Sequence, residues 1–181
     1  MVCNPYIHVL GVNRDISPGE AWDPAEFEGF AFSHDGSVRT LLPEEGILFE
    51  NQIEEYHVYI ASKATASCVA GAGQVALKNN ILLGGWCSFS CRLISPRRFA
   101  VRCRTEILQK QAGDAILTIR MRGVLRDAFE QTAKELVNPS DFKVRAYVTA
   151  LFLKKAKRAL LDIGWLITSC RLENIELSKG L

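Results

Sequence analysis

The sequence contains no long uninterrupted hydrophobic run. A charged residue breaks each apolar stretch before it reaches the ~18–20 residues that a membrane-spanning helix requires. The first residues also lack a basic segment followed by a long apolar one, so we expect no secretory signal and a cytoplasmic protein. In that compartment the six cysteines are expected to be reduced thiols. Hydrophobic residues still make up 48% of the 181-residue chain, enough for one domain or one domain with a small satellite.

Basic residues are scarce in the first third of the chain. Residues 1–60 contain only Arg14 and Arg39 against eleven acidic side chains, a net charge of −9. Residues 61–181 contain twenty basic against nine acidic side chains, a net charge of +11. This asymmetry fits three arrangements: local neutralisation between the two parts, an anionic partner for the second part, or head-to-tail attraction between copies of the chain.

Turn-forming residues divide the first half into short segments. Clusters such as Ser17-Pro18-Gly19 and His34-Asp35-Gly36 separate apolar pieces, among them 27–32 and 38–42. This pattern is typical of short strands joined by tight turns, so we expect a β-rich first half. Further on, Gly71-Ala72-Gly73 lacks the Gly-Lys-Ser/Thr of a phosphate loop, and a strand bulge or a tight turn is the favoured interpretation.

An alternating segment follows at residues 86–94. One face is uniformly apolar and is predicted to point into the core; it consists of Cys87, Phe89, Cys91 and Leu93. Pro96 must end this strand, because proline has no amide hydrogen to donate. Proline also suits the first position of a helix, so a short helical step is expected to turn Phe99 inward.

The remaining sequence has helical periodicity. Asp114 is a candidate N-cap for a helix over 115–137, and a second helix is predicted over 139–163. Its apolar seam is predicted to consist of Phe142, Ala146, Thr149, Leu153, Ala156, Leu160 and Ile163. Gly164 then ends the helix, and 165–177 reads as a returning strand. The expected fold class is α+β, with an acidic segment at 1–60 and an α+β core at 61–181.

The order of these parts resembles the SPFH family, also called band 7, which includes stomatins, prohibitins and flotillins. In that family a strand that ends in a polar residue and proline, followed shortly by phenylalanine, precedes a long helix; Ser95, Pro96 and Phe99 occupy those places here. The family's second helix ends in glycine before a hydrophobic strand, as at Gly164. The resemblance covers about residues 75–177. It implies a non-enzymatic scaffold domain that self-associates into a homo-oligomer.

Catalytic and metal-binding chemistry is not predicted. Cys87 and Cys91 share a strand face but lie about 13 Å apart at ~3.3 Å per residue, too far for one tetrahedral zinc ion. We interpret these cysteines as small buried hydrophobes. The histidines His8, His34 and His57 have no nucleophile nearby in the sequence, so a hydrolytic triad is unsupported. We expect no cofactor, no metal and no small-molecule substrate.

Two basic clusters are the candidate partner-binding residues. They are Arg97, Arg98, Arg102 and Arg104, followed by Lys154, Lys155, Lys157 and Arg158. They fit a solvated surface, a phosphate-rich partner such as anionic lipid headgroups or RNA, or the acidic first third of a neighbouring copy. The sequence thus leaves two hypotheses: a self-associating scaffold that lies on a membrane surface, and a module that binds RNA or another anion.

Overall fold

The computed structural model of the chain describes residues 7–12, 25, 27–32, 37–41, 57–62, 65–77, 81–109, 113–135 and 141–179. Its α+β fold confirms the expected class: strands fill the first half, helices follow, and a strand closes the chain. The chain divides into two compact units. Unit 1 contains Met1–Ala66, Arg92–Ile116 and Ile163–Trp165, and unit 2 contains Ser67–Cys91, Leu117–Asp162 and Leu166–Leu181. The division into an acidic segment at 1–60 and an α+β core at 61–181 stays a prediction.

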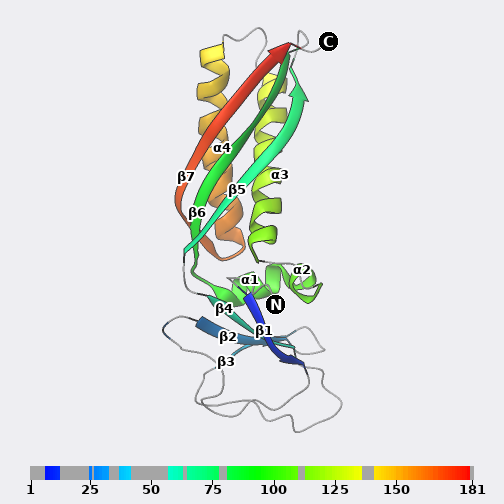
Figure 1. Cartoon of the computed structure of the whole chain (residues 1–181), viewed down its shortest axis with the longest axis vertical. Coiled ribbons are helices and arrows are strands. Elements are labelled where there is room, and N and C mark those ends of the chain that lie inside the picture. Colours follow the sequence, from blue (N-terminus) through cyan, green and yellow to red (C-terminus); the bar gives the residue numbers. More distant parts are fainter. Residues whose placement is uncertain are drawn as a thin grey trace. The chain divides into compact units, whose positions relative to one another are not determined.

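Unit 1 contains a four-stranded antiparallel sheet (Figure 1). Its strands are β1 (Ile7–Val12), β2 (Phe27–Phe32), β3 (Val38–Leu41) and β4 (His57–Ser62), in the order β1-β4-β2-β3. The short strands predicted from the turn clusters are thus present. In β2, Phe30 and Phe32 are buried, and their rings meet edge to face with centroids 5.7 Å apart. Aromatic pairs prefer this geometry, so the strand anchors the core of the unit.

Two short helices, α1 (Pro96–Arg102) and α2 (Arg104–Leu108), follow the strand that ends at Leu93. Helix α1 contacts β2 and β3. Ser95 is its N-cap, and the Ser95 hydroxyl accepts a hydrogen bond from the amide of Arg98 at 3.4 Å. Pro96 begins the helix, where its missing amide hydrogen costs nothing. The predicted proline-led helical step is therefore confirmed.

Phe99 is fully buried, as predicted. Its ring meets that of Trp165 edge to face, with centroids 5.5 Å apart. Between these parts of the chain, the carbonyl of Gly164 accepts hydrogen bonds from the amides of Ile94 and Ser95 at 2.9 and 3.0 Å. Gly164 has a φ of +84°, and a Cβ there would lie 2.4 Å from the Ser95 carbonyl oxygen. This position therefore requires glycine, which explains the helix stop predicted there.

Unit 2 contains most of a three-stranded sheet and of two long helices. The strands are β5 (Thr65–Ala76), β6 (Ile81–Leu93) and β7 (Trp165–Lys179), in the order β5-β6-β7. Helices α3 (Gly113–Glu135) and α4 (Asp141–Asp162) lie side by side over one face of this sheet (Figure 1). Cys87, Phe89 and Cys91 are buried, which confirms the predicted core face of β6. Gly71 and Gly73 lie within the continuous strand β5 and not in a turn.

The seam predicted for the second helix is partly wrong. Helix α4 buries a row with a period of four, which consists of Val144, Val148, Phe152, Ala156 and Leu160. Ala156, Leu160 and Ile163 of the predicted seam are buried, but Ala146 is exposed and Thr149 and Leu153 are only half-buried. A row with steps of four runs obliquely around a helix, whereas a heptad seam runs nearly along it. The side chain of the remaining predicted seam residue, Phe142, is outside the part of the chain that the structure describes.

The helix boundaries also differ slightly from the prediction. Helix α3 begins at Gly113, so Asp114 lies in its first turn rather than before it. There the Asp114 carboxylate accepts a hydrogen bond from the amide of Ala115 at 2.9 Å. An acidic side chain in the first turn is favourable because the free amides of the turn give that end of the helix a partial positive charge.

Candidate functional site

The first basic cluster is divided between an exposed helix surface and an aromatic contact. Arg97, Arg98 and Arg102 of α1 are exposed. Arg104 begins α2 and is half-buried, with its guanidinium carbon 5.9 Å from the ring centroid of Phe32. A guanidinium at this distance is attracted by the negative face of the ring. Arg104 thus helps to pack α2 onto β2, and only the α1 arginines offer an accessible charged surface.

The second basic cluster lies mainly on the exposed side of α4. Lys154, Lys157 and Arg158 are exposed, whereas Lys155 is half-buried. Lys154 lies one turn before Lys157 and Arg158, because residues three and four apart are neighbours on a helix surface. Lys157 also lowers the pKa of Cys170, although burial raises that pKa more strongly. The α4 basic face, defined as Lys154, Lys157 and Arg158, is therefore a second accessible positive surface beside that of the α1 arginines.

A hydrogen-bond network ties the end of α3 to α4. The Tyr147 hydroxyl donates to the carboxylate of Glu135, which also accepts from the side-chain amide of Gln131 at 2.7 Å. These two hydrogen bonds lower the pKa of Glu135, and Lys155 lowers it further. The same hydrogen bond raises the pKa of Tyr147. The network holds a carboxylate in its charged form at the surface, and a structural role in joining the helices accounts for it.

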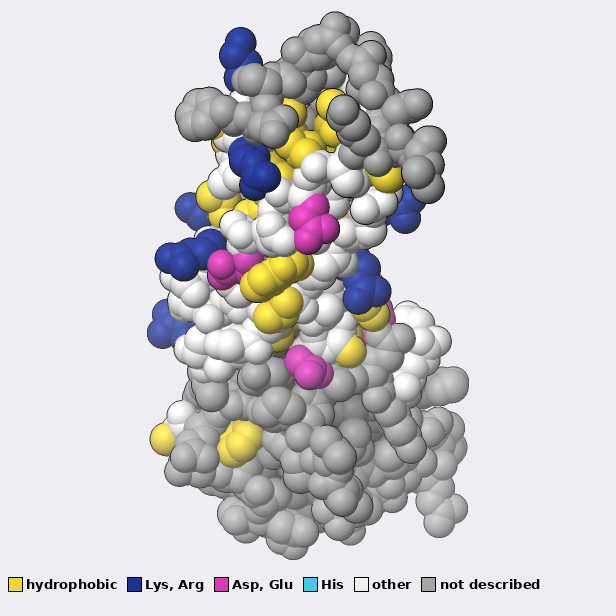
Figure 2. All heavy atoms as spheres, turned by 45° about the horizontal axis from the view of Figure 1, so that its top comes forward, with side chains coloured by type: hydrophobic (Ala, Val, Ile, Leu, Met, Phe, Trp, Pro, Cys, Tyr) yellow, Lys and Arg dark blue, Asp and Glu magenta, His cyan; other side chains and the backbone are white. Residues whose placement is uncertain are grey.

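The face of the unit 2 sheet opposite the helices is open. Two large hydrophobic side chains are exposed on it: Val69 (59%) and Trp86 (40%). Figure 2 looks onto this side and shows hydrophobic side chains near the middle, with acidic side chains close by and basic ones at the margins. Contiguous exposed hydrophobic surface is uncommon on monomeric proteins and often marks an interaction site. We call Val69 and Trp86 the open-face patch.

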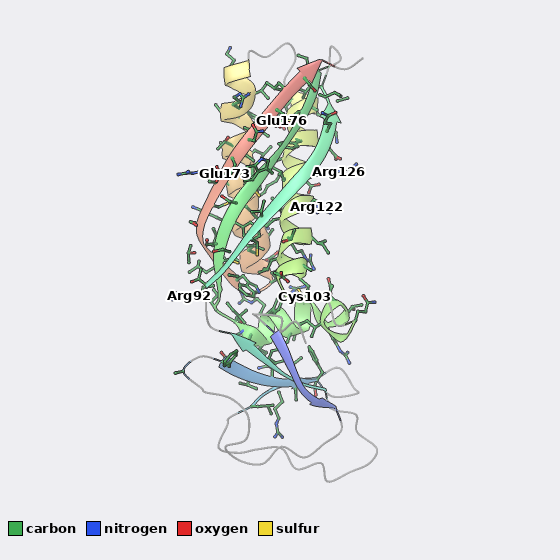
Figure 3. The ribbon with its side chains drawn as sticks, in the orientation of Figure 1. Arg92, Cys103, Arg122, Arg126, Glu173 and Glu176 are labelled. Atoms are coloured by element: carbon green, nitrogen blue, oxygen red, sulfur yellow. The ribbon has the colours of Figure 1, made fainter. Side chains whose placement is uncertain are left out.

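Hydroxyl side chains connect the strands around the open-face patch. The side chains of Ser67 and Ser90 are hydrogen-bonded at 3.0 Å across β5 and β6, and Ser88 donates to the carboxylate of Glu173 on β7 at 2.5 Å. Figure 3 shows Glu173 and Glu176 along β7, and Arg122 and Arg126 along α3. The three strands are thereby tied together on their open side by polar contacts, although no described helix or strand of unit 2 forms a second layer over this face.

The thiols of the sheet lie on its helix-covered side. Cys87 and Cys91 are fully buried, and the pKa of each is raised to about 12, mainly by burial and to a lesser degree by the neighbouring thiols of Cys170 and Cys68 respectively. A thiol with such a pKa is protonated at neutral pH, so it is a poor nucleophile and a poor metal ligand. Within the described ranges, no group of three or more His, Cys, Asp or Glu side chains is arranged to hold a metal ion.

The open-face patch is the feature that sequence reasoning missed. The alternation over 86–94 puts Trp86 on the face opposite Cys87, but it does not show whether that face is covered. Two signals point to it in retrospect: β5 contains no charged residue, and its small side chains leave Trp86 accessible. At Gly71 an added Cβ would lie 3.7 Å from the Trp86 Cβ, so a glycine stands directly beside the ring-bearing residue.

Comparison with known proteins gives no further guide, since no family model and no curated protein matches this sequence. None of the helices in the described part of the chain combines the length and the apolar character needed to cross a membrane.

Proposed function

We propose that the chain is an SPFH-like scaffold domain that self-associates and has no catalytic role of its own. The observation that carries the proposal is the open face of the unit 2 sheet, where Val69 of β5 and Trp86 of the neighbouring strand β6 are both exposed. Large apolar side chains on a sheet that lacks a second layer are energetically favourable only when something covers them. Another copy of the same chain is the simplest cover for a scaffold.

The local structure around Pro96 supports the SPFH likeness. Strand β6 ends at Leu93, Ser95 caps α1, a proline opens that helix, and Phe99 is buried four residues after the cap. Helix α4 then ends before Gly164, and β7 returns to the sheet. The SPFH resemblance rests on these positions. In this chain they bring the rings of Phe99 and Trp165 into contact.

Size-exclusion chromatography with light scattering tests self-association directly. We expect the full chain to elute with a mass that is a multiple of the 20.1 kDa of one copy. The apparent mass should rise with protein concentration, because association follows mass action. A mass of one copy over the whole accessible concentration range contradicts the proposed function.

A second candidate function, anion binding, is favoured by the α4 basic face. Lys154, Lys157 and Arg158 are exposed on adjacent turns of one helix. Each basic residue near an anionic membrane contributes about 1 kcal/mol, so three of them give roughly a hundredfold preference for an anionic over a neutral surface. Anionic lipid headgroups are the partner we propose, which places the scaffold peripherally on a membrane.

Charge reversal on α4 separates the two anionic partners. The variant K154E/K157E/R158E should lose roughly a hundredfold in binding to phosphatidylserine vesicles in a flotation assay. The variant K143E/R145E, which changes exposed residues near the start of the same helix, is the matched control and should float nearly as well as the unchanged chain. Circular dichroism should show equal helix content for all three. If the unchanged chain retards an RNA probe in a gel but does not bind vesicles at the same salt concentration, the membrane assignment is contradicted and RNA is supported as the partner.

A further inference from the structure

Strand β5 forms one edge of the unit 2 sheet. Ser67 lies beside Ser90, and the amide of Leu77 donates to the carbonyl of Ile81 at 2.6 Å, so β5 runs antiparallel to β6. The sheet order is β5-β6-β7, and no other described strand pairs with the outer side of β5. Within the described part of the chain, β5 is thus an edge strand whose outer side faces no other strand.

The two edges of this sheet differ in their protection. Edge strands in monomeric proteins are commonly short or carry charges, proline or bulges, which prevent pairing with other chains. Strand β7 carries Arg171, Glu173 and Glu176. Strand β5 is twelve residues long and contains no charged residue and no proline. By composition and length β5 is an unprotected edge, whereas β7 is not.

We propose that β5 pairs antiparallel with β5 of a second copy of this chain, so that one sheet continues across a twofold axis. This inference rests on the proposed function, since it names the surface by which the scaffold self-associates. Self-pairing of β5 places no like charges opposite each other, because the strand has none. If the helices of both copies lie on the same side of the continued sheet, pairing of β5 with β7 of another copy would be parallel, and parallel pairs are slightly less stable.

Shape favours one register of the two strands. With Ala70 on the axis, Val69 of each copy stands opposite Gly71 of the other copy, on the open face. Gly71 has no side chain and lies beside Trp86, so the incoming Val69 can reach the indole. Val69 is 59% exposed and Trp86 40% exposed in the single chain. The pairing thus buries the facing sides of Val69 and Trp86 and joins the two patches into one apolar surface on the open face.

Matched lysine substitutions test the edge. Val69→Lys adds a positive charge to each side of the proposed axis, and we expect the dissociation constant of the dimer to rise about tenfold or more. Leu166→Lys is the control, because it makes the same kind of change at an exposed apolar residue of β7, the opposite edge of the sheet. It should leave the dissociation constant unchanged. Light scattering measures both, and thermal melts show whether each variant is folded.

Hydrogen exchange of the unchanged chain gives a readout that needs no variant. Amides on the outer side of β5 should become protected as protein concentration rises, whereas amides of β7 should not change. If oligomers form but Val69→Lys leaves them intact, or if β5 amides exchange at the same rate at all concentrations, the β5 edge is not the contact and only this inference fails. A chain that stays monomeric overturns both this inference and the proposed function.

Discussion

Truncation of Phe99 to alanine should lower the free energy of unfolding by roughly 3–5 kcal/mol, the cost of removing a buried aromatic ring from a packed core. Phe99 is 0% exposed and meets Trp165 edge to face at 5.5 Å, so alanine loses both the apolar burial and the ring contact. Ser95, Pro96 and Gly164 fix the backbone around the ring, so the site has little freedom to collapse into the cavity. Urea unfolding monitored by tryptophan fluorescence measures the change.

Val101→Ala is the control for this prediction. Val101 belongs to the same helix α1 but is 55% exposed, so its truncation should change the free energy of unfolding by less than about 0.5 kcal/mol. A loss below about 1 kcal/mol for Phe99→Ala, or equal losses for the two variants, is incompatible with Phe99 as the anchor of the proline-led step.

The burial of Phe99 was predictable because its causes are local. A proline ends a strand and opens a helix through its own covalent geometry, and the next apolar residue on the inner side of the first turn must be buried. Its partner, Trp165, was not predictable in the same way. That residue is remote in the sequence, and only the hydrogen bonds from Ile94 and Ser95 to Gly164 bring it to the ring.

The seam of α4 shows where periodicity stops being informative. The predicted seam advances in alternating steps of four and three residues, close to a heptad, and it includes Ala146, which is exposed. The helix instead buries Val144, Val148 and Phe152. The choice among neighbouring rows of apolar residues depends on the angle at which the helix crosses its neighbours, and that angle is a property of the tertiary structure.

The candidate site was predictable only in part for the same reason. Three of the four predicted basic residues of α4 lie on an exposed helix surface, since helical period and charge both act locally, whereas Lys155 is half-buried. Arg104 was grouped with its sequence neighbours, although it contacts Phe32 of a distant strand. The open-face patch depends on which side of the sheet the helices cover, and alternation in β6 defines two faces without saying which element meets the outer one.

Substitution of Gly85 by alanine should cost about 3 kcal/mol, at the upper end of what an overpacked position typically costs. A Cβ built at Gly85 would lie 2.1 Å from the carbonyl oxygen of Asn174, far closer than any real contact of this kind. The contacted oxygen belongs to the backbone of the paired strand β7, so no flexible side chain can move aside. Strand β7 must shift away from β6, which weakens their hydrogen bonds and opens the sheet.

Gly73→Ala provides the matched comparison, because Gly73 is also a strand glycine of unit 2 but has nothing within 4 Å of an added Cβ. There alanine should be neutral or should stabilise the fold by about 0.4–1 kcal/mol, since it restricts the unfolded chain without strain in the folded one. Urea unfolding of both variants measures the difference, and faster hydrogen exchange of β7 amides should accompany Gly85→Ala alone. If the two variants differ by less than about 0.5 kcal/mol, β6 and β7 do not approach as closely at Asn174 as this packing requires. The contrast isolates the close approach itself, because both changes add the same methyl group to a strand and differ only in what that methyl group meets.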